Sequence, residues 1–249
     1  MMGRIDELMR AVARESGGEV FHAGLVEGLP EPARRYLLHA IRPGARIAGS
    51  VRLRIKARMR LSPKARWMPV DSTETIGREL GFVWKASVGR LLRISGFDRY
   101  SNGAGEMRWK LLGLIPVVTA SGPDVTRSAR GRFAAELVLL PDALLPQWGV
   151  AWTAEGSDGA CATVEVGGER IDLHLKVGAD GRLKKLEMLR WGDYGLPKGR
   201  WAHIPYAVAF SSEREFDGHT IPDRFTVAWE GASGHFDYFH GEVHSATYC

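Results

Sequence analysis

Two charged side chains near the middle of the chain are spaced for acid–base chemistry. Arg132 and Glu136 stand four residues apart in a segment with helical periodicity, so they share one face of the expected helix. If that helix covers a cavity, Glu136 enters apolar surroundings, where a carboxyl group can serve as a general acid or base. A solvated surface ion pair has the same spacing. The pair therefore marks a candidate site, and we assign no catalytic residue from the sequence.

A second unusual feature is a strand-like segment, VRLRIKARMRL, in which cations alternate with apolar residues. Alternation places Arg52, Arg54 and Arg58 on one face of a strand, with about 6.6–7 Å between successive cations. Such a row predicts an anion-binding surface for a phosphate head group or an anionic membrane. Alternatively, carboxylates on neighbouring strands, such as Asp71 and Glu74, neutralise it.

The sequence lacks the common motifs for metal binding and for nucleophilic catalysis. The sequence contains no HExxH or CxxC motif, no P-loop, no GxSxG and no GxGxxG that opens a helix. His240 and His244 share a face of an expected strand, but four residues along a strand span about 13 Å, too far to bind one ion. Asp172 and His174 also share a face. We predict no metal site, no cofactor and no disulfide between Cys161 and Cys249.

Composition limits the class of protein. The chain has 249 residues, of which 45% are hydrophobic and 25% charged, as in globular proteins. Its formal net charge is +5, but the chain has no compact block of Lys and Arg, so nucleic acid is not an expected partner. No apolar run reaches the roughly 20 residues of a membrane-spanning helix, and the first residues do not resemble a signal peptide. We therefore expect a cytoplasmic protein, or a periplasmic one if a leader has been removed.

Helices are expected at the start and in the middle of the chain. Residues 4–14 have helical spacing of apolar side chains, and a second helix opens at Pro30 and ends before Pro43. A third helix is expected over about 123–140, capped by Asp124 and ended by Pro141.

Most of the remaining chain has the pattern of antiparallel strands. About ten or eleven strands follow one another, separated by turns such as Gly167-Gly168 and Asp217-Gly218. The expected fold class is α+β: a strongly curved antiparallel sheet, or half-open barrel, with two N-terminal helices and one inserted helix. We predict a single domain over 1–249, with the helices in 1–45 and the sheet in 46–249.

A curved sheet with one apolar face must cover that face, and helices lying across it often leave a ligand cavity. The sequence therefore favours a protein that binds a lipid or another hydrophobic ligand between sheet and helices. The expected ligand-binding residues are Trp84, Trp109, Phe133, Glu136 and Leu137. Two alternatives stay open: an enzyme with an acid–base site near Arg132 and Glu136, and a protein-interaction module.

Several segments in order resemble a bacterial family of unknown function, DUF6544 (formerly DUF6920). They are residues 29–37 (LPEPARRYL), 81–84 (GFVW), 105–108 (GEMR), 111–114 (LLGL), 132–136 (RFAAE), 141–145 (PDALL), 221–222 (IP) and 236–239 (FDYF). The resemblance implies no activity.

The expected layout also looks like the half-barrel of periplasmic lipoprotein carriers of the LolA and LppX kind. That resemblance implies an incomplete antiparallel barrel with helices as a lid over an apolar cavity. It rests on architecture rather than on motifs.

Overall fold

The computed structural model describes residues 7, 10, 18–231 and 234–249. All strands belong to one antiparallel sheet of 13 strands in the order β6-β5-β4-β3-β2-β1-β13-β12-β11-β10-β9-β8-β7. They are β1 (Ser50–Met59), β2 (Met68–Gly77), β3 (Gly81–Val88), β4 (Ile94–Ser101), β5 (Ala104–Leu111), β6 (Ile115–Ser121), β7 (Ala151–Ala154), β8 (Gly159–Val166), β9 (Glu169–Val177), β10 (Leu183–Gly192), β11 (Ala202–Phe216), β12 (His219–Gly231) and β13 (Gly234–Tyr248). Two meanders, β1–β6 and β7–β13, therefore meet where β1 pairs with β13.

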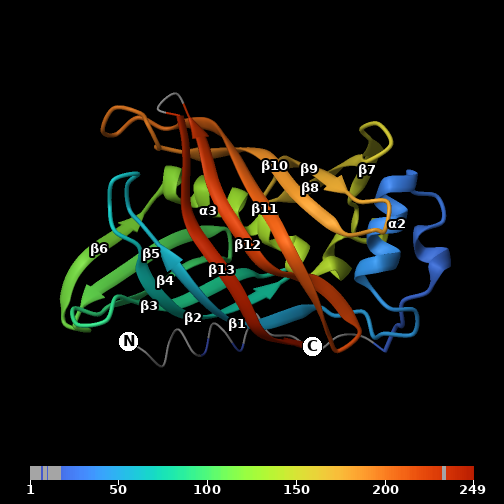
Figure 1. Ribbon diagram of the computed structural model, residues 1–249, viewed down its shortest axis with the longest axis horizontal. Coiled ribbons are helices and arrows are strands. Elements are labelled where there is room, and N and C mark those ends of the chain that lie inside the picture. The colour runs from blue at the N-terminus through green and yellow to red at the C-terminus, as the bar shows by residue number, and fades with distance from the viewer. Residues whose placement is uncertain (1–6, 8–9, 11–17, 232–233) are drawn as a thin grey trace.

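A helix inside the curve joins the two outer edges of this sheet. Helix α3 (Pro123–Glu136) connects β6 to β7 and packs against β5 in one meander and β10 in the other, which requires strong curvature (Figure 1). The other helical segments between residues 18 and 231 are η1 (Ala23–Val26), α2 (Glu31–Ala40), η2 (Leu137–Leu139), η3 (Pro141–Leu144) and η4 (Pro146–Trp148). The expected curved, open antiparallel sheet is confirmed, whereas the helix expected over 4–14 lies outside the described residues except for 7 and 10.

The expected number of ten or eleven strands was wrong, and the hairpin formed by β5 and β6 is one source of the difference. The sequence pattern indicates a single strand over 105–120, but the chain reverses between Leu111 and Ile115, which pair with each other. Leu112 and Gly113 both have positive φ, 51° and 73°. A hairpin turn of this type normally carries Asn or Asp before Gly. Because Leu112 takes the place of that Asn or Asp, the sequence pattern does not indicate a turn here.

The inserted helix is also shorter than the expected 123–140. It ends at Glu136, and Leu137–Leu139 form a tighter 3-10 turn in which the backbone N–H of Leu140 bonds to the carbonyl of Leu137. Pro141 explains the change, because proline offers no N–H to the carbonyl four residues earlier and disfavours helical geometry in the residue before it.

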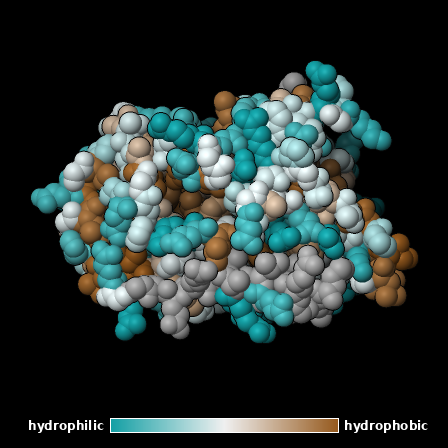
Figure 2. All heavy atoms as spheres, turned by 180° about the vertical axis from the view of Figure 1, so that it is seen from behind, coloured by the Kyte–Doolittle hydropathy of each residue, from teal (hydrophilic) through white to brown (hydrophobic). Residues whose placement is uncertain are grey.

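The hydrophobic core fills only part of the concave face. Along β1 the inward side chains of Val51, Leu53 and Ile55 are buried, whereas Met59 at the far end is only partly buried. Figure 2 shows that the rear face is hollowed near its middle, with hydrophobic side chains inside the hollow. Within residues 18–231, no helix combines the length and apolarity needed to cross a membrane.

Candidate functional site

One arginine inside the curve binds three carboxylates. The guanidinium of Arg132 donates to Glu136 Oε1 at 2.6 Å, to Asp98 Oδ2 at 3.0 Å and to Glu74 Oε1 at 3.0 Å. The Cζ atom of Arg132 also lies 4.6 Å from the ring centre of Phe82 and 4.8 Å from that of Trp84. We call Arg132, Glu74, Asp98 and Glu136 the carboxylate cluster.

The register of the sheet places two of these carboxylates. Glu74 on β2 stands opposite Trp84 on β3, and Trp84 stands opposite Asp98 on β4, so all three point to the concave face. The indole N–H of Trp109 donates to Asp98 at 2.8 Å. Trp109 can lie there because Gly96, its partner on β4, has no side chain in its way. Helix α3 supplies the arginine from the opposite side.

Burial, and then the excess of carboxylates over cations, shifts the pKa values of the cluster. Burial, followed by the charge of Glu136, raises the pKa of Glu74 well above its ordinary value. Burial also raises the pKa of Asp98, although the charge of Arg132 opposes the increase. Glu136 Oε2 is buried without a hydrogen-bond donor, and a proton on the neighbouring Glu74 would satisfy it. The arginine keeps its charge, because the three carboxylates outweigh burial and raise its pKa.

The meander β7–β13 contributes an arginine of its own, and this one is buried. Arg190 on β10 lies over the rings of Tyr206 and Trp229, at 4.9 and 5.2 Å, and donates to the carbonyl of Ser128 on α3 at 3.2 Å. Gly131 leaves room for it, since a Cβ there would lie 3.0 Å from Arg190 Cγ. Helix α3 is thus held from both meanders by arginine contacts.

Apolar side chains next to the cluster remain partly exposed. Met59 faces Met68 across β1 and β2 at inward positions, and the ring of Phe239 lies 6.2 Å from that of Trp84. Met59 and Met68 lie where the β1–β2 hairpin turns, and the partly exposed side chains extend from there along the concave face to Met107, which stands opposite Asp98. We call this group the open end; it comprises Met59, Met68, Ile94, Met107, Phe225 and Phe239.

The residues expected to bind a ligand fall into two groups. Trp84, Trp109 and Glu136 lie together at the carboxylate cluster. Phe133 instead packs against the ring of Tyr100 at 6.0 Å, and Leu137 is buried in the core. All five assignments stay predictions.

The arginines expected to bind anions lie on the other face of the sheet. Arg52, Arg54 and Arg58 are exposed on the convex face of β1, and Arg58 donates to His240 Nδ1 at 3.1 Å. The suggestion that Glu74 neutralises this row was wrong, because its register with Leu53 turns it inward. Asp71 does lie opposite Lys56 in the same row. The anion-binding role stays a prediction.

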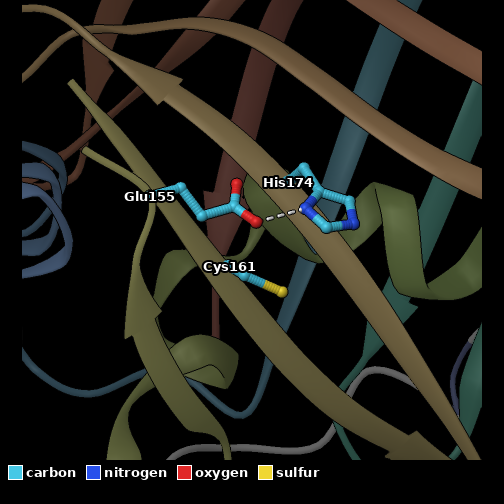
Figure 3. Close-up of side chains that lie close together, drawn as sticks. All are labelled: Glu155, Cys161 and His174. Atoms are coloured by element: carbon cyan, nitrogen blue, oxygen red, sulfur yellow. Dashed lines mark hydrogen bonds and ion pairs between the residues drawn. The ribbon is translucent and has the colours of Figure 1, made fainter.

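One cluster of potential metal ligands was not predicted from the sequence. Glu155, Cys161 and His174 lie together on the convex face of β7–β9, and Glu155 is 2.7 Å from His174 Nδ1 (Figure 3). Burial, together with the charges of Asp172 and Glu155, raises the pKa of the Cys161 thiol. A signal existed in the sequence: a two-residue turn at Gly167-Gly168 places Cys161 opposite His174.

His219 and His235 do not share a site. His219 is buried, with its Nε2 2.8 Å from Asp142 Oδ2 and its ring stacked on Tyr248 at 3.9 Å. His235 instead forms an exposed pair with Glu230 at 2.6 Å. The first arrangement joins β12 and β13 to the segment after α3, which is a structural role.

Comparison with known proteins identifies a family and several similar structures. A model described as a family of unknown function (DUF6920) matches residues 27–248. No curated protein matches the chain.

Three solved structures illustrate the structural similarity. A LolA superfamily protein from Nitrosomonas europaea has 10% identity and a TM-score of 0.47, with 88% of this chain and 92% of that chain covered. A putative outer membrane lipoprotein-sorting protein domain from Vibrio parahaemolyticus has 10% identity and a TM-score of 0.39, with 80% and 85% covered. A DUF1329 family protein from Desulfovibrio piger has 11% identity and a TM-score of 0.41, with 88% and 90% covered.

Proposed function

Because this chain belongs to DUF6920, a family of unknown function, we propose its function from its own geometry: it binds a hydrophobic small molecule or lipid at the open end of the concave face. The observation that supports this most is the row of inward-facing apolar side chains that the core leaves partly exposed. In a sheet that has a complete core, inward positions of this kind are buried.

The composition of the open end suits an apolar ligand of variable shape. Met59, Met68 and Met107 supply flexible, polarisable side chains that adapt to different partners. Phe239 and Trp84 add flat aromatic surface. The carboxylate cluster lies beside this surface and forms the polar border of the space that a ligand would fill.

Binding is tested with 1-N-phenylnaphthylamine, a fluorescent apolar probe, and by native mass spectrometry with solvent extraction of the purified protein. We expect an extractable apolar molecule or, after its removal, saturable probe binding. The double substitution Met59→Gln/Met107→Gln should weaken probe binding by about tenfold, because buried amides without partners cost about 1–3 kcal/mol.

The matched control is Leu189→Gln, which makes the same change of polarity at an exposed leucine of β10, outside the open end. This variant should bind the probe like the unchanged protein. An empty protein that binds no probe would contradict the proposal, and so would equal binding by the double variant.

A second observation favours contact with an anionic membrane, at a different place from the arginine row of β1. Leucines at two adjacent hairpin tips are strongly exposed: Leu91 at 95% and Leu114 at 78%. The tips touch, since the backbone N–H of Leu112 bonds to the carbonyl of Arg93 at 2.8 Å. Hydrophobic atoms also protrude at the right-hand end of Figure 2, which is the left-hand end of Figure 1, where β5 and β6 lie. We call this surface the leucine edge; it comprises Leu91, Leu92, Leu112, Leu114, Ile115, Val117 and Val118.

The charges around the leucine edge support a membrane as its partner. Arg90, Arg93 and Lys110 surround the tips, and neither 88–97 nor 107–123 contains an acidic residue. Exposed leucines enter the apolar part of a bilayer, while nearby cations attract anionic head groups. A membrane at this edge would be a source or destination for an apolar ligand.

Vesicle flotation tests the leucine edge. The protein should float with vesicles of phosphatidylcholine and phosphatidylglycerol, less at high salt, and more weakly with phosphatidylcholine alone. Leu91→Glu/Leu114→Glu should lower the bound fraction at least about tenfold, because burial of each leucine contributes about 1.5–3 kcal/mol.

Leu189→Glu is the matched control and should float like the unchanged protein. If the double variant floats normally, the edge does not bind membranes. If it instead converts a dimer to a monomer in light scattering, the edge joins two copies of the chain and the membrane assignment is wrong.

A further inference from the structure

Three side chains of different ligand chemistry meet on the convex face of β7–β9. The potential ligand atoms of Glu155, Cys161 and His174 all lie within 4.8 Å of one another. Figure 3 shows the carboxylate and the imidazole facing each other across the group, with the sulfur beside them. This site is separate from the open end and from the carboxylate cluster.

The local fold forces these residues together. Cys161 on β8 and His174 on β9 are direct cross-strand partners, so their side chains share a face. Glu155 follows β7, and its backbone N–H bonds to the carbonyl of Gly159 at 2.8 Å, which brings the chain back over β8. A Cβ on Gly159 would lie 2.5 Å from the carbonyl oxygen of Glu155, so this tight return requires glycine.

We propose that Glu155, Cys161 and His174 bind a divalent metal ion of the zinc type. A thiolate, an imidazole and a carboxylate are the three protein ligands that Zn²⁺ prefers, and three of them leave a fourth position for water or another ligand. Hard ions such as Mg²⁺ and Ca²⁺ prefer oxygen ligands throughout and suit this set poorly. Binding releases the thiol proton of Cys161 to solvent. The imidazole proton that bridges His174 to Glu155 moves to the other ring nitrogen, so that small movements replace this hydrogen bond with two metal–ligand bonds.

Comparison within the protein distinguishes this site from an ordinary surface pair. Glu230 and His235 form a similar exposed contact at 2.6 Å, but no third ligand completes a group there among the residues that the structure describes. At the proposed site a buried cysteine supplies that ligand. His174 also lines a pocket of about 220 Å³ with Arg127, Trp191 and His203, and the side chains of His174 and Glu155 are 47% and 41% exposed, so these two ligands are reachable from solvent.

Titration of the full chain with Zn²⁺ and Co²⁺ tests the proposal. The starting protein carries Cys249→Ser, which leaves Cys161 as its one thiol. We expect one Zn²⁺ per chain by calorimetry and, with Co²⁺, the absorption band of a thiolate–cobalt bond. Cys161→Ser should remove that band, and His174→Ala should weaken Zn²⁺ binding at least about tenfold, since loss of even an outer partner of a ligand costs 10–100-fold.

Two further measurements keep the result interpretable. His174 is about half exposed, so His174→Ala tests the site even if Cys161→Ser fails to fold. His235→Ala is the matched control and should bind Zn²⁺ normally. The absence of a thiolate–cobalt band in the Cys249→Ser protein would overturn the proposal, and so would equal loss of Zn²⁺ binding in His235→Ala and His174→Ala.

Discussion

Replacement of Arg132 by methionine is expected to lower the free energy of unfolding by about 3–5 kcal/mol at neutral pH. Three carboxylates depend on this guanidinium, and the side chain of Glu74 is only 3% exposed. Methionine has a similar length and fills the space beside Trp84, so the loss comes from unpaired buried carboxylates rather than from a cavity.

The cost of this change depends on pH. The pKa values of Glu74 and Asp98 are raised in the folded protein, so each contributes stability that is fully present below its ordinary pKa and is lost as pH rises through its folded pKa. Arg132 lowers both values. Without it they rise further, and the loss of stability extends to higher pH. The variant should therefore be close to the unchanged protein in acid and fall progressively behind it toward neutral pH.

Urea unfolding at a series of pH values measures this difference. Arg127→Met is the matched control, because Arg127 is a more exposed arginine of the same helix whose pair with Glu169 contributes about 1 kcal/mol or less. Arg132→Met/Glu136→Gln should recover part of the loss, since one carboxylate is then neutral. A pH-independent loss below about 1 kcal/mol in Arg132→Met would show that the carboxylates do not need the arginine.

Replacement of His219 by leucine is expected to cost a similar 3–5 kcal/mol. The side chains of His219 and Asp142 are 2% and 0% exposed. The carboxylate of Asp142 lies 2.8 Å from His219 Nε2 and accepts no hydrogen bond from the described residues. Leucine also loses the stacking on Tyr248, whose hydroxyl group donates to the carbonyl of Leu139. An isolated carboxylate in the core then destabilises the folded state.

Chemical unfolding of the single and double variants separates these effects. Asp142→Leu/His219→Leu should be more stable than His219→Leu alone, because a buried pair can be replaced by apolar side chains at little cost. His235→Leu, which removes an exposed partner of Glu230, should change stability by less than about 0.5 kcal/mol. If the double variant is the least stable of all, the pair itself contributes the stability and the explanation from an orphaned carboxylate is wrong.

Local pattern was enough to determine the class of fold. Apolar residues alternate with Arg52, Arg54 and Arg58 in β1, and this period of two determines which face of a strand is buried. Glycine-containing turns between strands favoured an antiparallel meander, and Pro123 marked the start of α3. The expected cap was wrong: Gly122 is the N-cap, and Asp124 accepts a hydrogen bond from the indole of Trp191 instead. The segments that resemble DUF6920 were also recognised from the sequence. The hairpin at Leu112 was not predicted from the sequence, because leucine is not expected at positive φ.

The candidate sites depended on long-range pairing. Arg132 and Glu136 could be placed together because four residues make about one helical turn. Glu74 and Asp98 could not be added, since strand register and sheet curvature bring them to α3 from 58 and 34 residues away.

Exposure was likewise decided in three dimensions. Leucine is a residue type typical of hydrophobic cores. Only the position of Leu91 and Leu114 at the edge of the sheet leaves these two side chains in solvent. The sequence by itself therefore determined most of the elements and their buried faces, because those follow from periods of two and 3.6 residues. The tertiary structure alone decided which charges meet inside and which apolar side chains stay outside, because curvature and register are properties of the whole sheet.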